Sequence, residues 1–280
     1  MNWRQVRMCG DPPQIATAQV PPIGESDDKI FTTDHAVIVL DGASAFVPVE
    51  LPASTYADRL GRELRQQLTA EPRADLAEVL YTAIEATAHE FDLRPGESPS
   101  STVAIARARA RWLDVLVLGD TDVITPGHAV KDVRIDALDL APRRRYRERL
   151  AAGTGYDDEH RRLLRELQHE QAKHRNREGG YWIAEAAPEA AKHALTEQLP
   201  ASETPWAILV TDGAYEVMEH LDLDDWPQLA EAMSSELEAT LRRCHTWEQH
   251  EDPDARSLPR AKRHDDKSIA TIQCQTSARS

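Results

Sequence analysis

The chain has 280 residues, of which 41% are hydrophobic and 29% charged, as in an ordinary globular protein and unlike a disordered one. Its formal net charge of -15 argues against general binding to nucleic acid or anionic membranes, which needs an excess of lysine and arginine. No apolar stretch approaches the roughly 20 residues of a membrane span, and the N-terminus lacks the apolar core of a signal peptide, so we expect a cytoplasmic protein.

The first half of the chain predicts short strands followed by a pair of helices. Residues 4–9 and 36–40 have the pattern of strands, and a polar turn at 24–29 lies between them. Leucine and other apolar residues then recur at about every fourth position within 56–68 and again within 76–88. This spacing is typical of two amphipathic helices.

The second half mixes strands with a long charged excursion. Residues 100–108 and 111–124 predict two antiparallel strands and a third short one, with a tight reversal at about 110–111. Residues 141–180 are highly charged and mostly helical in pattern, and such long excursions are often functional. The elements expected after it are a strand at 181–186, a short helix from Pro188, a strand at 206–213, a helix at 226–244 and a strand at 268–274. Because strands and helices come in blocks, we expect an α+β fold with antiparallel sheets.

Carboxylates follow several of the apolar runs. Asp41, followed by Gly42, and Asp212, also followed by glycine, end two of them, and Asp120 comes directly after a glycine. One such pair after a strand is more commonly a turn. Several in one chain predict carboxylates that meet at one end of the core, where repulsion would raise their pKa values unless a cation intervened. Ligands that are all oxygen select Mg²⁺ or Mn²⁺.

The order of these motifs resembles that of the PPM family, the metal-dependent protein serine/threonine phosphatases of type 2C. In chain order the motifs are GESDDKI, VIVLDGAS, SSTVAIA, VLGDTDVI, ILVTDGAYEV and DDKSIATI, which together span residues 24–272. The resemblance implies a single phosphatase domain over 1–280, built as a four-layer α-β-β-α sandwich with two central antiparallel sheets flanked by helix pairs. The metal site would lie at one edge of the sandwich.

The resemblance also implies a centre of two Mn²⁺ or Mg²⁺ ions. Carried over residue by residue, the metal ligands are Asp27, Asp41, Gly42, Asp212 and Asp265, with Asp120 and Glu216 at a third, weaker metal position. Within this set Asp41 would bridge the two ions and Gly42 would offer its backbone carbonyl. Asp28 is the acidic neighbour of the first ligand. Ser101 and Thr102 match a buried strand motif with a structural role.

The activity that the resemblance implies is hydrolysis of phosphoserine or phosphothreonine in proteins. Asp41 and Asp212 would act through a metal-activated water that attacks phosphorus in line, while the cations neutralise charge on the phosphoryl oxygens. The partners would be a phosphorylated protein substrate and a serine/threonine kinase. Arginine outnumbers lysine and alanine is abundant, a composition typical of a GC-rich bacterial genome.

Two departures from the family pattern leave an alternative open. Ile23 stands where some members have an arginine that holds the substrate phosphate, and Ala43, Ser44 and Ala45 follow Asp-Gly where others have a histidine. The alternative is a catalytically inactive PPM-like module that binds a phosphoprotein and regulates it. A phosphatase that acts on a small phosphorylated metabolite is a third reading.

An arginine-rich run begins the charged excursion. A solvated helix whose arginines pair with nearby acids is the simpler explanation of such a run. PPM phosphatases carry a variable flap beside the active site at this place, so the segment at 141–180 is expected to act as a flap. Its candidate substrate-binding residues are Arg143, Arg144 and Arg145, because guanidinium groups bind phosphate oxygens in pairs.

Overall fold

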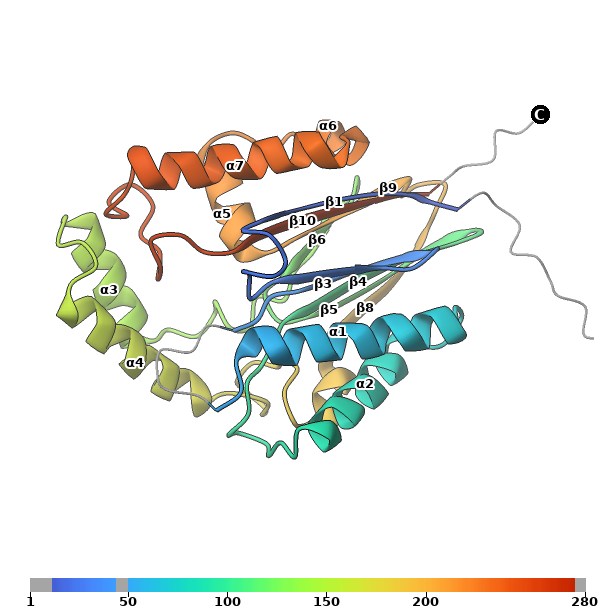
Figure 1. Ribbon diagram of the computed structural model, residues 1–280, viewed down its shortest axis with the longest axis horizontal. Helices are drawn as coiled ribbons and strands as arrows, with labels where there is room; N and C mark the ends of the chain where they lie inside the picture. Colours follow the sequence, from blue (N-terminus) through green and yellow to red (C-terminus); the bar gives the residue numbers. More distant parts are fainter. Residues whose placement is uncertain (1–11, 44–49, 275–280) are drawn as a thin grey trace, which may run out of the picture.

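The computed structural model describes residues 12–43 and 50–274, and this part of the chain contains two stacked five-stranded antiparallel sheets (Figure 1). The first sheet has the strand order β1 (Gln14–Val20), β10 (Lys267–Gln273), β9 (Trp206–Val210), β6 (Asp122–Ile124) and β7 (Ala129–Val130). The second has the order β2 (Lys29–Thr32), β3 (Ala36–Leu40), β4 (Val103–Arg109), β5 (Trp112–Leu118) and β8 (Leu195–Pro200). The predicted α+β class is confirmed.

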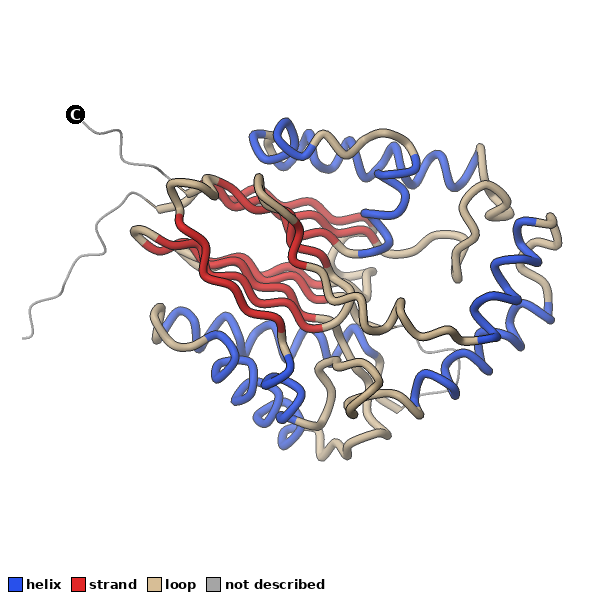
Figure 2. Tube along the Cα trace, turned by 180° about the vertical axis from the view of Figure 1, so that it is seen from behind, coloured by secondary structure: helices blue, strands red, loops and turns tan. Residues whose placement is uncertain are grey.

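Helices cover the outer face of each sheet. The second sheet is covered by α1 (Ala53–Ala70), α2 (Leu76–Glu90) and the 3-10 helix η1 (Pro188–His193), and the first by α5 (Asp212–His220), α6 (Trp226–Glu231) and α7 (Ser234–His250). The pair α3 (Ala141–Ala151) and α4 (Asp158–Ala172) lies at one end of the sandwich in both views (Figures 1 and 2). The four-layer α-β-β-α arrangement is therefore confirmed. Among the described residues, none of the helices has both the length and the apolar character of a membrane span.

Burial on both faces explains why the central strands are continuous apolar runs. In β3, Ile38 and Leu40 pack toward α1 and α2, whereas Val37 and Val39 pack between the two sheets. A half-exposed strand would alternate apolar and polar residues, but here both faces are covered by protein. The residue that follows such a strand leaves the core at its end, so the same apolar run that buries β3 places Asp41 at the edge of the sandwich.

The helix pair α3 and α4 has a small core of its own. Tyr146 and Leu150 of α3 pack against Leu163 and Leu167 of α4, and Ala255 closes the cluster. The remaining faces of both helices carry many of the charged residues of the chain. The predicted helical character of 141–180 is confirmed up to the end of α4, after which the chain continues in turns.

Several sequence-based predictions of secondary structure differ from the structure. The strand expected at 181–186 is wrong, because only isolated bridges at Tyr181 and Ala184 form there. The neighbouring strand is instead β8, which was not predicted. The single helix expected at 226–244 is also wrong, since Ala232 and Met233 adopt extended backbone and separate α6 from α7. The strand expected at 4–9 lies outside the described residues.

Candidate functional site

The predicted carboxylates gather at one end of the sandwich because four strands begin or end there. Asp41 follows β3, Asp120 lies just beyond β5, Asp212 begins α5 after β9, and Asp265 lies just before β10. Antiparallel pairing of β9 with β10 brings the last two together across the sheet. All four line one cavity of about 930 Å³.

The carboxylates lie close enough to perturb one another. The pKa of Asp41 is raised well above its ordinary value by burial and then by Asp28, Asp212 and other carboxylates of the cluster. Burial raises the pKa of Asp212 to about 6, with Asp265 adding to the effect, and a hydrogen bond to Asp41 opposes it. Burial and then Asp212 raise the pKa of Asp120 to about 8. The site therefore concentrates negative charge that protons or cations must neutralise.

Of the acidic pair Asp27 and Asp28, it is mainly Asp28 that contributes a buried carboxylate to the cluster. Asp28 is 1% exposed and accepts a hydrogen bond from Thr211 Oγ1 at 3.1 Å. Burial, with the nearby carboxylates of Asp266 and Asp265, raises its pKa to about 7. Asp27 is less buried, and its backbone N–H donates to Asp266 at 2.6 Å. Neither residue of the pair is among those that line the cavity.

Glycine follows two of the aspartates because neighbouring backbone comes very close. A Cβ on Gly42 would lie 2.8 Å from the carbonyl oxygen of Asp27. A Cβ on Gly213 would overlap the carbonyl oxygen of Asp266. The Asp-Gly pairs thus let the Asp27 segment and the Asp265–Asp266 segment approach the ends of β3 and β9. Asp-Gly after a strand commonly forms a turn, and the structure adds this packing reason for the two glycines.

The Ser-Thr motif before β4 holds the backbone of Asp41. The Ser101 hydroxyl donates to the Asp41 carbonyl at 2.9 Å, and the Thr102 backbone N–H donates to the same oxygen at 2.9 Å. The Asp41 N–H donates to Thr102 Oγ1 at 3.2 Å. Both residues are buried, in agreement with the structural role that the resemblance implies.

A lysine that the sequence analysis missed lies inside the acidic cluster. Lys262 Nζ is 2.8 Å from Asp265 Oδ1. Burial opposes the charge on Lys262, but Asp265 and then Asp41 raise its pKa above the ordinary value. Lys262 therefore supplies one positive charge to the cluster. No periodic pattern precedes it in the loop between α7 and β10, so the sequence alone gave no signal for it.

Only part of the predicted arginine group faces the cavity. Arg143 lines it, donates to the Ile135 carbonyl at 3.0 Å and lies 3.6 Å from Asp136 Oδ1. Arg144 pairs with Asp139 on the exposed surface, and Arg145 is exposed; neither lines the cavity.

A further arginine of the same helix reaches the acidic end of the cavity. Arg147 lines the cavity, and its Nη2 lies 3.9 Å from Glu216 Oε1. The Glu216 side chain is half-buried at the mouth of the cluster, and its pKa is raised, first by this partial burial and then by the carboxylate of Asp212. Ile23 is 50% exposed and does not line the cavity, whereas Ala43 does. Arginine therefore reaches this end of the cavity from α3 and not from the segment at Ile23.

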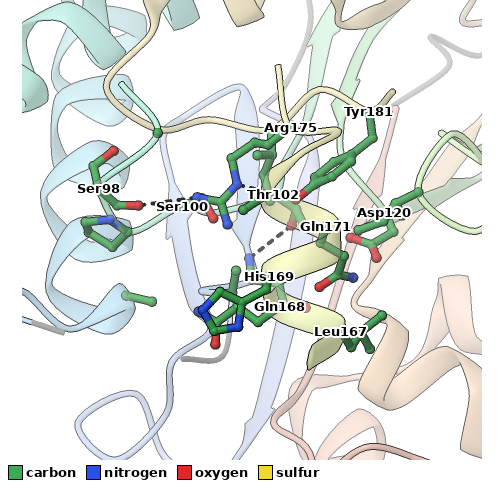
Figure 3. A pocket seen from close by; sticks show the side chains of 18 of the residues that line it. Ser98, Ser100, Thr102, Asp120, Leu167, Gln168, His169, Gln171, Arg175 and Tyr181 are labelled. Carbon is green, nitrogen blue, oxygen red and sulfur yellow. Dashed lines mark hydrogen bonds between the residues drawn. The ribbon is translucent and has the colours of Figure 1, made fainter. Parts of the chain in front are cut away.

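The cavity continues away from the acids into a polar arm. Figure 3 shows Arg175 between Ser98 and Tyr181, with Asp120 on the Tyr181 side. Arg175 donates to the Ser98 carbonyl at 3.4 Å and to the Tyr181 hydroxyl at 3.3 Å. Buried Glu185 lies behind it, with Arg175 Nη1 at 3.9 Å. The arm is thus lined by groups that can bind polar parts of a ligand.

Comparison with solved structures gives neighbours for the whole fold. PppA, "a key regulatory component of T6SS in Pseudomonas aeruginosa", is 17% identical with a TM-score of 0.53, covering 94% of this chain and 97% of that one. The photosystem II phosphatase PBCP is 15% identical with a TM-score of 0.57, covering 94% and 99%. The catalytic domain of the serine threonine protein phosphatase PstP, in complex with two manganese ions, is 11% identical with a TM-score of 0.52, covering 94% and 98%.

The comparisons find proteins with the same architecture but no protein with a closely related sequence. No protein-family model matches the chain, and no curated protein matches it. PppA, PBCP and PstP, which match over most of its length, are PPM-family serine/threonine phosphatases, the family that the motif order resembles. At identities of 10–17% such likeness establishes the fold alone. The chain therefore has the fold of the PPM-family serine/threonine phosphatases.

Proposed function

We propose that this protein is a metal-dependent phosphatase that hydrolyses phosphoserine or phosphothreonine in proteins. The observation that carries the proposal is the convergence of Asp41, Asp120, Asp212 and Asp265 on one cavity, with raised pKa values at three of them. A protein that only needed stability would not bury acids that repel one another. The same fold in protein phosphatases supports the reading.

The donor set fits hard divalent cations. Every candidate ligand is an oxygen, which suits Mg²⁺ or Mn²⁺ and not a thiolate-binding metal. We assign two ions to Asp27, Asp41, Gly42, Asp212 and Asp265, and a third, weaker ion to Asp120 and Glu216. When bound, such cations acidify water and stabilise the charge that develops on phosphoryl oxygens.

The protein side chains bind and orient the substrate. Arg143 and Arg147 project from α3 into the acidic end of the cavity, where a phosphate group would exchange their present carboxylate contacts for two charge-assisted hydrogen bonds. The two contacts are long, at 3.6 and 3.9 Å, so little is lost when they are exchanged. Asp41 and Asp212 are held in place by Ser101, Thr102 and the start of α5. In this proposal 141–180 is the flap that delivers the arginines.

Replacing the cavity arginines is expected to weaken substrate binding. Arg143→Ala and Arg147→Ala should each raise KM for a phosphothreonine peptide by about tenfold, the effect of losing one charge-assisted hydrogen bond. Arg144→Ala is the matched control, because it lies on the same helix outside the cavity. Steady-state kinetics would decide. KM values equal to that of the wild type for all three variants would show that α3 is not part of the binding site.

The substrate class can be separated by one comparison. The cavity has a volume of about 930 Å³ and includes the polar arm at Arg175. This volume would accommodate peptide residues on both sides of a phosphorylated side chain. Phosphate release should therefore be faster from phosphopeptides than from phosphosugars or nucleotides. The partners that we propose are phosphorylated proteins and the serine/threonine kinase that produces them, in the cytoplasm of a bacterium. Preference for a small metabolite would favour the third reading instead.

Lys262 supports the regulatory module as a second candidate. Its ion pair with Asp265 places a permanent positive charge where a metal ligand is expected. If Lys262 only lowers the metal affinity of an active site, Lys262→Met should strengthen Mn²⁺ binding by about tenfold, because the change removes a positive charge that competes with Mn²⁺. Isothermal titration would measure this, with Lys192→Met, a surface lysine of η1, as the control. Unchanged Mn²⁺ affinity, together with absent turnover in the wild type, would favour the inactive module.

A further inference from the structure

A second group of potential metal ligands lies outside the acidic cavity. His245 and Glu248 stand three residues apart on α7, so they share one face of the helix. His264, in the segment before β10, faces them. One ligand atom from each of these three residues lies within 4.8 Å of the others. The set combines two imidazoles with one carboxylate, unlike the all-oxygen donors of the phosphatase site.

The carboxylate of this group is buried and only partly satisfied. Glu248 is 1% exposed, and its Oε2 accepts from Lys267 Nζ at 2.8 Å. Its Oε1 is buried and makes no hydrogen bond within the described residues; Arg260 Nε lies 3.6 Å away. A buried oxygen without a partner is costly, and such atoms commonly mark a missing ion or water. Burial raises the pKa of Glu248 even though Lys267 and Arg260 oppose it.

The two imidazoles lie close to each other and to the Glu248 carboxylate. The rings of His245 and His264 lie 4.4 Å apart between centroids, and His264 Nδ1 is 3.3 Å from Glu248 Oε2. Burial and then His264 lower the pKa of His245.

The segment that carries His264 is fastened by its own hydrogen bonds. The Asp252 carboxylate accepts from the backbone N–H groups of Arg256, Ser257 and Leu258, and from Arg260 Nη1 at 2.8 Å. Because these bonds fix the segment, little ordering would be needed when a metal binds.

We propose that His245, Glu248 and His264 form a binding site for a transition metal, with Zn²⁺ as its natural occupant. Two imidazoles and a carboxylate are a common protein donor set for Zn²⁺. The nearby charges of Lys267 and Arg260 reduce the attraction for any cation, so hard ions that bind by charge alone are disfavoured, whereas Zn²⁺ gains from its bonds to nitrogen. Since His264 directly precedes Asp265, the ion would fasten α7 to the segment that carries a proposed phosphatase ligand.

Zinc binding measured in excess Mg²⁺ tests this site. Mg²⁺ keeps the all-oxygen site occupied, so equilibrium dialysis followed by metal analysis should find one retained Zn²⁺ in the wild type. The double variant His245→Ala/His264→Ala should lose it, with affinity at least about tenfold weaker. Asp212→Asn should retain the ion, because it changes only the acidic cavity. His250→Ala is the matched control, since His250 is an exposed histidine of the same helix.

X-ray absorption of the zinc-loaded wild type provides a measurement that needs no variant. The proposal expects two nitrogen ligands at about 2.0–2.1 Å and one carboxylate oxygen. A wild type that retains no Zn²⁺ in excess Mg²⁺ would overturn the proposal, and so would a spectrum with oxygen ligands only. Neither result depends on phosphatase activity, so the zinc site and the proposed function can fail independently.

Discussion

Asp41→Asn is expected to abolish phosphate release, with kcat/KM reduced by at least about 10³-fold, while the metal-free protein becomes more stable by about 1–2 kcal/mol. The first effect follows because Asp41 is the proposed bridging ligand. The second follows because burial and the carboxylates of Asp28 and Asp212 oppose its charge, and asparagine removes that repulsion. Loss of activity with gain of stability is the pattern of a site built for function.

The stability half of this prediction has a matched control. Asp114→Asn also removes a buried carboxylate, but Asp114 is paired with Arg107 at 2.8 Å and with Arg109 at 2.6 Å. Its loss should destabilise the protein, by about 3–5 kcal/mol at most, without removing activity per folded molecule. Chemical denaturation in EDTA would measure both variants. A metal-free Asp41→Asn protein that is less stable than the wild type would contradict the repulsion argument.

The metal-free protein is expected to lose stability as pH rises toward 8. Burial raises the pKa of Asp212 to about 6, of Asp28 to about 7 and of Asp120 to about 8, whereas an unfolded aspartate has a pKa of about 3.9. Between these values the folded protein holds protons that the unfolded chain has released. The free energy of unfolding therefore falls with pH, by up to about 1.4 kcal/mol per pH unit for each group, until pH passes the folded pKa.

Mn²⁺ should reverse this pH dependence. Cations bind the deprotonated carboxylates, so their stabilising effect grows as pH rises. The lowered pKa values of His245 and His264 act in the opposite direction near pH 6, and the comparison is cleanest between about pH 7 and 8. Denaturant midpoints measured across this range with EDTA and with Mn²⁺ would decide. A metal-free protein that becomes more stable from pH 7 to 8 would show that the pKa values of these carboxylates are not raised in the folded protein.

The sequence predicted the parts of the fold that large apolar residues encode. The strands β3 and β9 form where continuous apolar runs predict them, and the helices α1 and α2 form where apolar residues recur at every fourth position. β1 was missed because its buried side chains include Ala16 and Ala18, which are too small to give a clear strand pattern. The break between α6 and α7 was missed because no proline or glycine marks it.

The site was predictable where strands position its residues and not where loops do. Asp41, Asp120, Asp212 and Asp265 adjoin strands, so their meeting follows from sheet topology. The resemblance implies Asp27 as the first metal ligand, but a polar turn does not reveal which neighbour points inward, and Asp28 is the buried one. Lys262 and Arg147 reach the site through tertiary packing of a loop and of α3, which spacing in the sequence cannot show.

Phosphate release from a phosphothreonine peptide at increasing Mn²⁺ concentration tests the central claim most directly. The account predicts turnover that saturates with Mn²⁺, disappears in EDTA and is lost in Asp212→Asn, although that variant remains folded. A folded wild type that binds Mn²⁺ and releases no phosphate from any phosphopeptide would contradict the account, and the fold would then serve to bind a phosphoprotein without hydrolysing it.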